Sequence, residues 1–194
     1  MTGSRIFMTG VGGQGTLTAT TLLAKIALDR GFEVVSGEVH GMAQRGGVVE
    51  SMLLIGGWRS PRIAFGEADL LLGFEPLETL RALPYLAPGG RVLSSSEMLP
   101  PIGVTLQKER YPDLCEVQAQ VRAVAKDALF LPCQSLGSEA GSIQSGNSAL
   151  LGAACKAGAL PFGLDALEAG IKKHLPAKIV DVNLKAARLG ATWK

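Results

Sequence analysis

Short apolar runs alternate with longer stretches of helically spaced apolar residues along the first part of the chain. Residues 6–9 form an apolar run that leads into glycines, and residues 16–29 then place leucine, isoleucine and alanine at helical spacing. A second run over residues 32–36 predicts another strand, so this part predicts a β-α-β unit with parallel strands. Residues 37–47, rich in glycine and polar groups, predict a loop.

The rest of the chain keeps this alternation and then becomes helical. Apolar runs bounded by glycine and proline predict strands, whereas helical spacing with capping residues or a terminal glycine predicts helices. We expect strands over residues 48–55, 68–74, 91–95, 102–106 and 129–131, and helices over residues 77–86, 111–126, 146–158, 164–175 and 181–189. This order predicts a single-domain α/β fold, with a mostly parallel Rossmann-like sheet, helices on both faces and a helical C-terminal part.

The composition narrows the class of protein. The 194 residues suffice for one domain with its own core, and 47% hydrophobic against 19% charged residues excludes a disordered chain. A net charge of +2 without a lysine or arginine stripe argues against nucleic-acid binding. Apolar stretches are interrupted before the roughly 18 residues of a membrane span, and no signal-peptide pattern is visible. We therefore expect a cytoplasmic protein without membrane contact.

The cysteines and histidines do not form a recognisable metal or disulfide pattern. Cys115, Cys133 and Cys155 are odd in number and widely spaced, so we expect buried or half-buried thiols. His40 and His174 are too few and too ill-placed to indicate a metal pair, and His174 suits the C-terminal end of a helix dipole. No site for a metal is predicted.

A glycine motif follows the first predicted strand. Its spacing is that of the G-x-G-x-x-G turn, in which the first glycine makes a tight turn and the last lets the helix pack against the strand. The first-turn amides of the following helix then offer a site for an anion. Close packing of two loops is the alternative, and the lysine of a nucleotide-hydrolysing P-loop is missing. The candidate ligand-binding residues are Gly10, Gly12, Gly13, Gln14 and Gly15.

A second cluster of polar groups lies in the predicted loop over residues 37–47. Loops that leave the carboxyl ends of parallel strands meet at one edge of a sheet, so we expect this loop beside the glycine motif. A guanidinium there suits a carboxylate or phosphate, and an imidazole titrates near neutral pH. Internal pairing of the acid with the guanidinium is the alternative. The candidates are Glu38, His40, Gln44, Arg45, Gly46 and Gly47.

Few other residues suggest a cofactor site or a catalytic role. Glu38 stands near the place of a ribose-binding acid, but the missing helix after the second strand argues against NAD. Glu75, at the end of the 68–74 strand, either contacts a partner or substrate or supplies negative charge to a helix N-terminus. No nucleophile–base–acid arrangement is visible, so the catalytic residues stay unknown. These features favour a binding or assembly module over a complete catalyst.

Several motifs in order resemble one enzyme family. Gly10–Gly15, the run from Glu38 to Gly47, Phe74–Glu78 and Val182–Ala186 closely resemble the gamma-type subunit of 2-oxoacid:ferredoxin oxidoreductases. The H-G-M-A-Q-R-G-G form is most similar to the indolepyruvate:ferredoxin oxidoreductase branch, whose corresponding subunit is called beta. The similarity covers nearly the whole chain, so the resemblance implies one gamma-type domain over residues 1–194.

The resemblance also implies an activity and a division of labour. It implies oxidative decarboxylation of a 2-oxoacid, here an arylpyruvate such as indolepyruvate, with coenzyme A as co-substrate and ferredoxin as electron acceptor. In the family, thiamine diphosphate and iron–sulfur clusters lie mainly on partner subunits, so this chain would be the non-cofactor subunit of a hetero-oligomer and inactive alone. A 2-oxoglutarate or other ketoacid enzyme and a stand-alone nucleotide-binding module are the alternatives. We place a coenzyme A phosphate at residues 12–15 on the anion-site argument.

Overall fold

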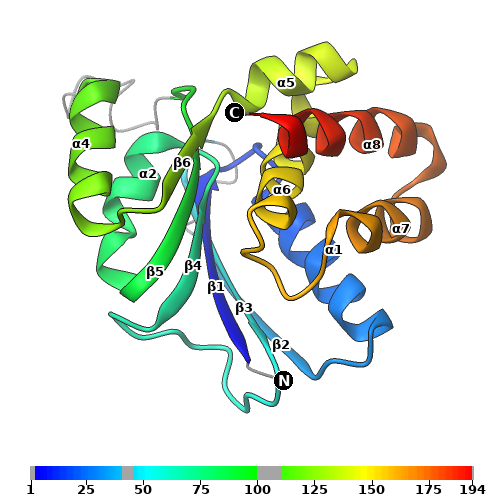
Figure 1. Ribbon diagram of the computed structural model, residues 1–194, viewed down its shortest axis with the longest axis horizontal. Helices are drawn as coiled ribbons and strands as arrows, with labels where there is room; N and C mark the ends of the chain where they lie inside the picture. Colours follow the sequence, from blue (N-terminus) through cyan, green and yellow to red (C-terminus); the bar gives the residue numbers. More distant parts are fainter. Residues whose placement is uncertain (1–2, 41–45, 100–110, 194) are drawn as a thin grey trace.

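The computed structural model describes residues 3–40, 46–99 and 111–193, which form a six-stranded sheet with helices on both faces (Figure 1). The strands are β1 (Ser4–Val11), β2 (Val34–His40), β3 (Val48–Ile55), β4 (Ala68–Gly73), β5 (Leu86–Ser95) and β6 (Ala128–Leu131). The α-helices are α1 (Thr16–Asp29), α2 (Pro76–Arg81), α4 (Leu114–Val124), α5 (Cys133–Ala140), α6 (Gly146–Lys156), α7 (Leu164–His174) and α8 (Ala177–Thr192). Two 3₁₀ turns are η1 (Leu83–Tyr85) and η2 (Ile143–Ser145).

Most strands of the sheet point in one direction. Their order is β2-β3-β1-β4-β5-β6, and β1, β4, β5 and β6 are mutually parallel. β3 lies antiparallel between β2 and β1, so β2 points the same way as β1, as predicted, but the two strands are not neighbours. The mostly parallel α/β architecture expected from the sequence is confirmed.

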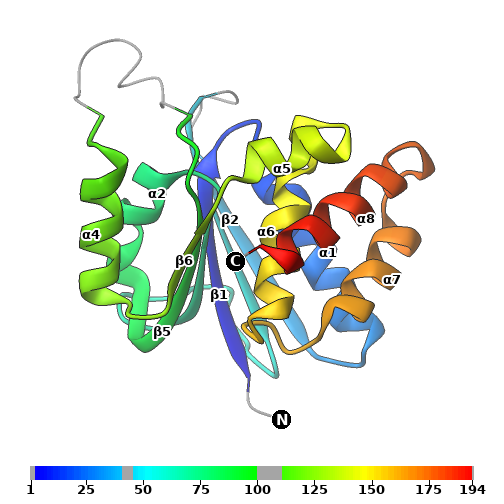
Figure 2. The ribbon, with the colours of Figure 1, turned by 45° about the horizontal axis from the view of Figure 1, so that its top comes forward.

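Two apolar layers hold the helices against the sheet. Side chains alternate between the faces of a strand, so Ile6 and Met8 of β1 point to one layer while Phe7 points to the other. The first layer packs against α1 and α5 to α8, and the second packs against α4 through Val117 and Val121. Figure 2 shows these helices on opposite sides of the sheet.

Long, strongly patterned segments match their predicted bounds. The helix predicted over residues 16–29 and the strand predicted over residues 48–55 coincide with α1 and β3. The strand predicted over residues 32–36 instead begins at Val34 and ends at His40. The prediction that residues 37–40 belong to a loop is therefore wrong.

Other segments change or fall outside the described chain. The helix predicted over residues 77–86 ends at Arg81 and gives way to η1, which contains Pro84; proline has no N–H to continue the helical hydrogen bonds. The sequence did not predict α5, and the strand predicted over residues 102–106 lies outside the described residues. α8 is longer than its predicted span over residues 181–189.

Candidate functional site

The glycine motif and the end of the second polar segment lie side by side, and backbone hydrogen bonds join them. The Gly12 N–H donates to the carbonyl oxygen of Gly47 at 2.8 Å, and the Gly46 N–H donates to the carbonyl oxygen of Gly12 at 3.3 Å. The expectation that the glycine motif meets the second segment is thus confirmed for these residues. Gln44 and Arg45, the other candidates of that segment, lie outside the described residues.

Gln14 closes the end of β1 with both ends of its amide. Its side-chain oxygen accepts the Val11 N–H at 2.8 Å, and its Nε2 donates to the carbonyl oxygen of Phe74 at 2.8 Å. Gly10 stays within β1, where a Cβ atom would lie 2.9 Å from the Gln14 side-chain oxygen and 2.9 Å from the Phe74 Cβ. The prediction that Gly10 makes a tight turn is therefore wrong. Its lack of a side chain instead leaves space for the side chains of Gln14 and Phe74.

The last two glycines of the motif have left-handed backbones and different surroundings. Gly13 has φ +108° and is exposed, and a Cβ atom there would meet no heavy atom within 4 Å. Gly15 has φ +81° and caps α1, and its Cβ would lie 2.6 Å from the Asn147 Nδ2 in the first turn of α6. The absence of a side chain at Gly15 therefore lets α6 pack closely against the start of α1. The prediction that Gly15 lets the helix pack against the strand is wrong. Gly13 presents bare main chain to open space.

Glu38 and His40 belong to a strand. Glu38 pairs with Ser51 of β3, and His40 pairs with Val49 at the end of β2. The prediction that they stand on a ligand-binding loop is wrong. Glu38 is exposed and lines a cavity of about 640 Å³ that opens over β2 and β3.

A crevice of about 170 Å³ lies beside Gly13 at the carboxyl ends of β1 and β4. β2 and β3 lie on one side of β1 and β4 to β6 on the other, and open α/β sheets bind ligands at such a switch point. Figure 2 shows the end of β1, the start of α1 and α5 grouped at this end of the molecule. The lining includes amides from Gln134, Gln144 and Asn147 and apolar side chains from Phe74, Leu99 and Ile143.

The crevice provides hydrogen-bond donors. α1 begins here with no acidic residue in its first turn and no side-chain cap, so its first-turn amides and its dipole favour an anion. The Nε2 of Gln134 is buried, and it has no hydrogen-bond partner within the described part of the chain. Unpaired buried donors are uncommon, which makes this amide a candidate contact for a bound acceptor.

The neighbouring helix α5 already has its anion. Its cap residue, Pro132, offers no side-chain acceptor, and the carboxylate of Glu97 accepts the backbone N–H of Gln134 and that of Ser135, the latter at 3.0 Å. The Ser135 hydroxyl also donates to Glu97 at 2.5 Å. Of α1 and α5, α1 is therefore the better site for an external anion. α6, whose first residues Gly146 and Asn147 also line the crevice, likewise begins without an acidic residue in its first turn.

Glu75 has a structural position at the same edge of the sheet. It is fully buried, and its carboxylate caps α2 by accepting the Glu78 N–H at 3.0 Å; it also accepts the Leu99 N–H at 3.4 Å. The Tyr111 hydroxyl donates to the same carboxylate. Burial raises the pKa of Glu75, and burial together with that hydrogen bond raises the pKa of Tyr111. Of the two roles left open for Glu75, the structure shows the helix cap.

Two of the three thiols and His174 have structural surroundings. Cys133 and Cys155 are buried, as expected, and burial raises the pKa of each to about 12. Cys115 is exposed, so the prediction of a buried or half-buried thiol is wrong for this residue. Within residues 3–40, 46–99 and 111–193, no group of three or more histidine, cysteine or acidic residues could hold a metal ion. His174 lies 2.7 Å from the Asp29 carboxylate, which links the end of α7 to the end of α1.

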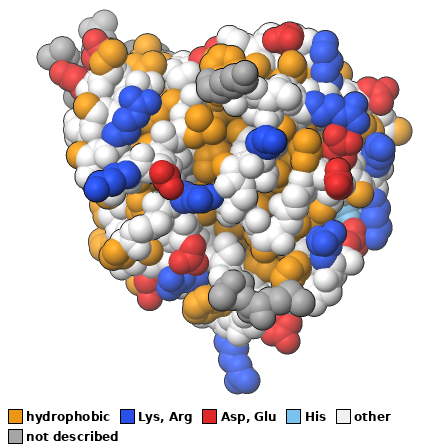
Figure 3. Space-filling model, viewed as in Figure 1, with side chains coloured by type: hydrophobic (Ala, Val, Ile, Leu, Met, Phe, Trp, Pro, Cys, Tyr) orange, Lys and Arg blue, Asp and Glu red, His pale blue; other side chains and the backbone are white. Residues whose placement is uncertain are grey.

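The surface carries charges of both signs. On the face shown in Figure 3, blue and red side chains are interspersed, without the continuous basic stripe of a nucleic-acid-binding surface. None of the helices described is long and apolar enough to span a bilayer.

The whole described fold matches one family. The model of the pyruvate ferredoxin/flavodoxin oxidoreductase family matches residues 5–193. The chain belongs to this family. It is 37% identical over 185 residues to "Indolepyruvate oxidoreductase subunit IorB" of Archaeoglobus fulgidus, covering 95% of this chain and 92% of that relative. The family resemblance found in the sequence is thereby confirmed.

Two more distant comparisons concern the extent of this unit. Pyruvate oxidoreductase subunit PORC from Thermotoga maritima has the same fold, with a TM-score of 0.69 at 21% identity, over 98% of this chain and 96% of that one. "Ketoisovalerate oxidoreductase subunit VorA" of Methanothermobacter thermautotrophicus is 24% identical over 191 residues, which are 97% of this chain but 36% of that relative. The unit described here thus also occurs as part of a longer chain.

Proposed function

We propose that this chain is the non-cofactor small subunit of an indolepyruvate:ferredoxin oxidoreductase. In this reaction an arylpyruvate undergoes oxidative decarboxylation to an acyl-coenzyme A while ferredoxin is reduced. The similarity to subunit IorB carries the proposal, because it extends over 95% of this chain and 92% of the relative. Residues 1–194 then form one gamma-type domain.

The catalytic cofactors belong, on this proposal, to a larger partner subunit in a cytoplasmic complex. Thiamine diphosphate supplies the carbanion chemistry and iron–sulfur clusters carry the electrons, so the chain described here does not act alone. The VorA relative supports a physical association, since the corresponding unit fills 36% of a longer chain there. A unit that is covalently attached in one family member must bind its partner non-covalently where it is a separate chain.

The crevice beside Gly13 is the proposed contribution of this subunit to ligand binding. Its donors, the first turn of α1 and the Nε2 of Gln134, suit a phosphate of coenzyme A or the carboxylate of the 2-oxoacid. Its volume of about 170 Å³ is below the roughly 300–1,000 Å³ of a complete small-molecule site, so it holds one group of the ligand. Leu99 and Ile143 line it and stay 38% and 49% exposed, which leaves apolar surface for the rest of the ligand or the partner.

The same geometry leaves room for two other functions. Backbone and amide groups recognise a charged group and not an aryl side chain, so the crevice fits a 2-oxoglutarate or other ketoacid enzyme equally well. A stand-alone nucleotide-binding module is supported by the position of the crevice at the switch point of the sheet.

Co-expression with the adjacent large subunit distinguishes these functions. We expect the tagged small subunit to capture a chain that contains thiamine diphosphate and iron, and the complex to reduce ferredoxin faster with indolepyruvate than with pyruvate or 2-oxoglutarate. Preference for 2-oxoglutarate would move the complex to the second function. A lone chain that retains stoichiometric nucleotide would contradict the subunit role.

A further inference from the structure

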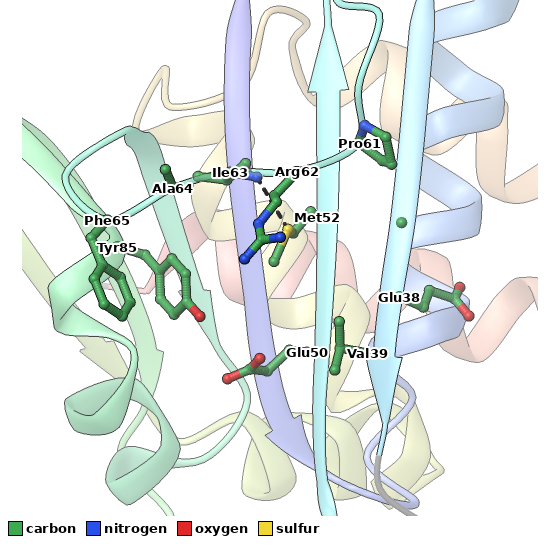
Figure 4. Close-up of a pocket in the computed structure, with 11 residues that line it drawn as sticks. Glu38, Val39, Glu50, Met52, Pro61, Arg62, Ile63, Ala64, Phe65 and Tyr85 are labelled. Carbon is green, nitrogen blue, oxygen red and sulfur yellow. Dashed lines mark hydrogen bonds between the residues drawn. The ribbon is translucent and has the colours of Figure 1, made fainter.

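The cavity of about 640 Å³ over β2 and β3 has a different chemistry from the crevice. It opens on the face of the sheet that carries α2 and α4, and residues 61–65, in an irregular segment, form one wall (Figure 4). Met52 forms part of the floor, and the Ile63 N–H lies 3.3 Å from its sulfur. This cavity therefore lies over the strands, whereas the crevice lies beyond their ends.

Aromatic and aliphatic side chains at its rim are exposed. Phe65 is 71% exposed and packs edge-on against Tyr85 at 4.8 Å, and Tyr85 stacks on the buried Phe7 at 4.1 Å. Val39, across the cavity on β2, is 57% exposed. Exposed apolar side chains gathered at one cavity are typical of an interaction site.

A carboxylate lies between these apolar walls. Figure 4 shows Glu50 between Tyr85 and Val39, facing the same open space. Burial raises the pKa of Glu50. Burial also raises the pKa of Glu78, which is ion-paired with Arg81, and the charge of Glu50 adds to that rise. Within the described chain, the Glu50 side chain makes no hydrogen bond and no ion pair. Arg62 lines another part of the cavity and is not ion-paired with it.

We propose that this cavity receives a lysine or arginine side chain carried on an apolar segment of the large partner subunit. The cation pairs with Glu50, its aliphatic stem packs against Phe65 and Tyr85, and the neighbouring apolar residues of the segment cover Val39. An acid without a partner in apolar surroundings is unfavourable in the free chain, and an incoming cation removes that cost. The inference rests on the proposed small-subunit function.

A protein segment fits the exposed surface better than a small cation does. Val39 and Phe65 stand on opposite sides of Glu50, and a ligand small enough to contact only the carboxylate would leave both in water. The VorA relative also shows that this unit has neighbours in a longer chain, which must be met by surfaces of the separate subunit here.

Binding of the purified large subunit to variants of this chain tests the proposal. We expect Glu50→Gln and Phe65→Ala each to raise the Kd at least about tenfold, and Glu50→Gln to reduce the salt dependence of binding. Asp181→Asn and Leu28→Ala are the matched controls, an exposed acid on α8 and an exposed apolar residue on α1, and should leave the Kd within about twofold.

A second measurement separates binding from folding. Hydrogen exchange should show that the amides of residues 62–65 are more protected in the complex than in the free chain. Glu50→Gln should raise the melting temperature of the isolated chain while weakening the complex. Wild-type Kd in both cavity variants, or no protection over these residues, overturns the proposal while the subunit function stands. If Phe65→Ala weakens the complex and Glu50→Gln does not, the apolar contact stands but the pairing of a cation with Glu50 is refuted. Failure of the wild-type chain to bind the large subunit overturns the subunit function and this inference together.

Discussion

Replacing Gly13 with leucine tests whether bare backbone at the crevice is needed for ligand approach. Gly13 has φ +108°, and a Cβ atom there meets no heavy atom within 4 Å, so the penalty arises from the backbone and not from a clash. A side chain forced into this region costs about 1–3 kcal/mol. For a domain of this size each kcal/mol lowers the melting temperature by about 2–4 °C, so we expect a fall of about 2–12 °C with the fold retained.

Gly31→Leu provides a control with the same backbone problem elsewhere. Gly31, just after α1, has φ +79° and also has no heavy atom within 4 Å of a Cβ position, but it lies at the opposite end of the helix from the crevice. Its melting temperature should fall by a similar amount. The two variants should differ only in the function of the assembled complex.

The assay is ferredoxin reduction by the reconstituted complex, measured once as a function of coenzyme A concentration and once as a function of 2-oxoacid concentration. Gly13 lines the crevice of about 170 Å³, so a leucine side chain there adds bulk where the ligand approaches. We expect the KM for coenzyme A or for the 2-oxoacid to rise at least about tenfold, or about 1.4 kcal/mol. Gly31→Leu should keep the wild-type KM. Equal kinetics in both variants would refute ligand approach at the glycine motif.

Three further predictions concern the isolated chain. Of its three cysteines, only Cys115 should react with iodoacetamide in the native state at pH 8, and mass spectrometry should find all three labelled after unfolding. The pKa of Glu50 is higher in the folded chain than its usual 4.5, so the folded state loses stability as pH rises through that range; Glu50→Gln should therefore stabilise at pH 7 and not below about pH 4 in urea titrations. Gly190→Ala should destabilise by about 1–3 kcal/mol in the same titrations, because its Cβ would lie 1.9 Å from the Ala149 carbonyl oxygen, whereas Gly163→Ala meets no such atom.

Local sequence patterns located elements well where the pattern was long. The pattern of α1 matched the structure because the helix buries one apolar stripe against a single layer, and that of β3 matched because its apolar run is buried on both faces of the sheet. Glycines were harder to interpret, because the same residue serves turns and close contacts. Gly37 suggested a loop, yet it lies in β2, where its Cβ would be 2.9 Å from the Pro61 Cβ in the segment that crosses the strand.

The candidate site shows the same limit. The proximity of Gly12 and Gly47 followed from parallel strands ending at one edge, which is a general rule of the fold. Gln134 and Glu97, which set the hydrogen bonding of the crevice, were missed because they come from α5 and from the end of β5, far from the motif in sequence. The one signal for Glu97 is indirect: α5 begins after Pro132, which has no side-chain acceptor, so its first N–H groups need an acid from elsewhere in the chain.

The crevice beside Gly13 and the cavity over β2 and β3 favour ligands of opposite charge, which suits their proposed roles. Glu97 satisfies the start of α5, so the donors that remain at the crevice, in α1 and Gln134, are available to an anion. Glu50 places an acid at the cavity over β3, where an anionic ligand would be repelled and a cation is favoured. An anionic ligand and a basic partner segment therefore do not compete for one site, and each can bind with the other already in place.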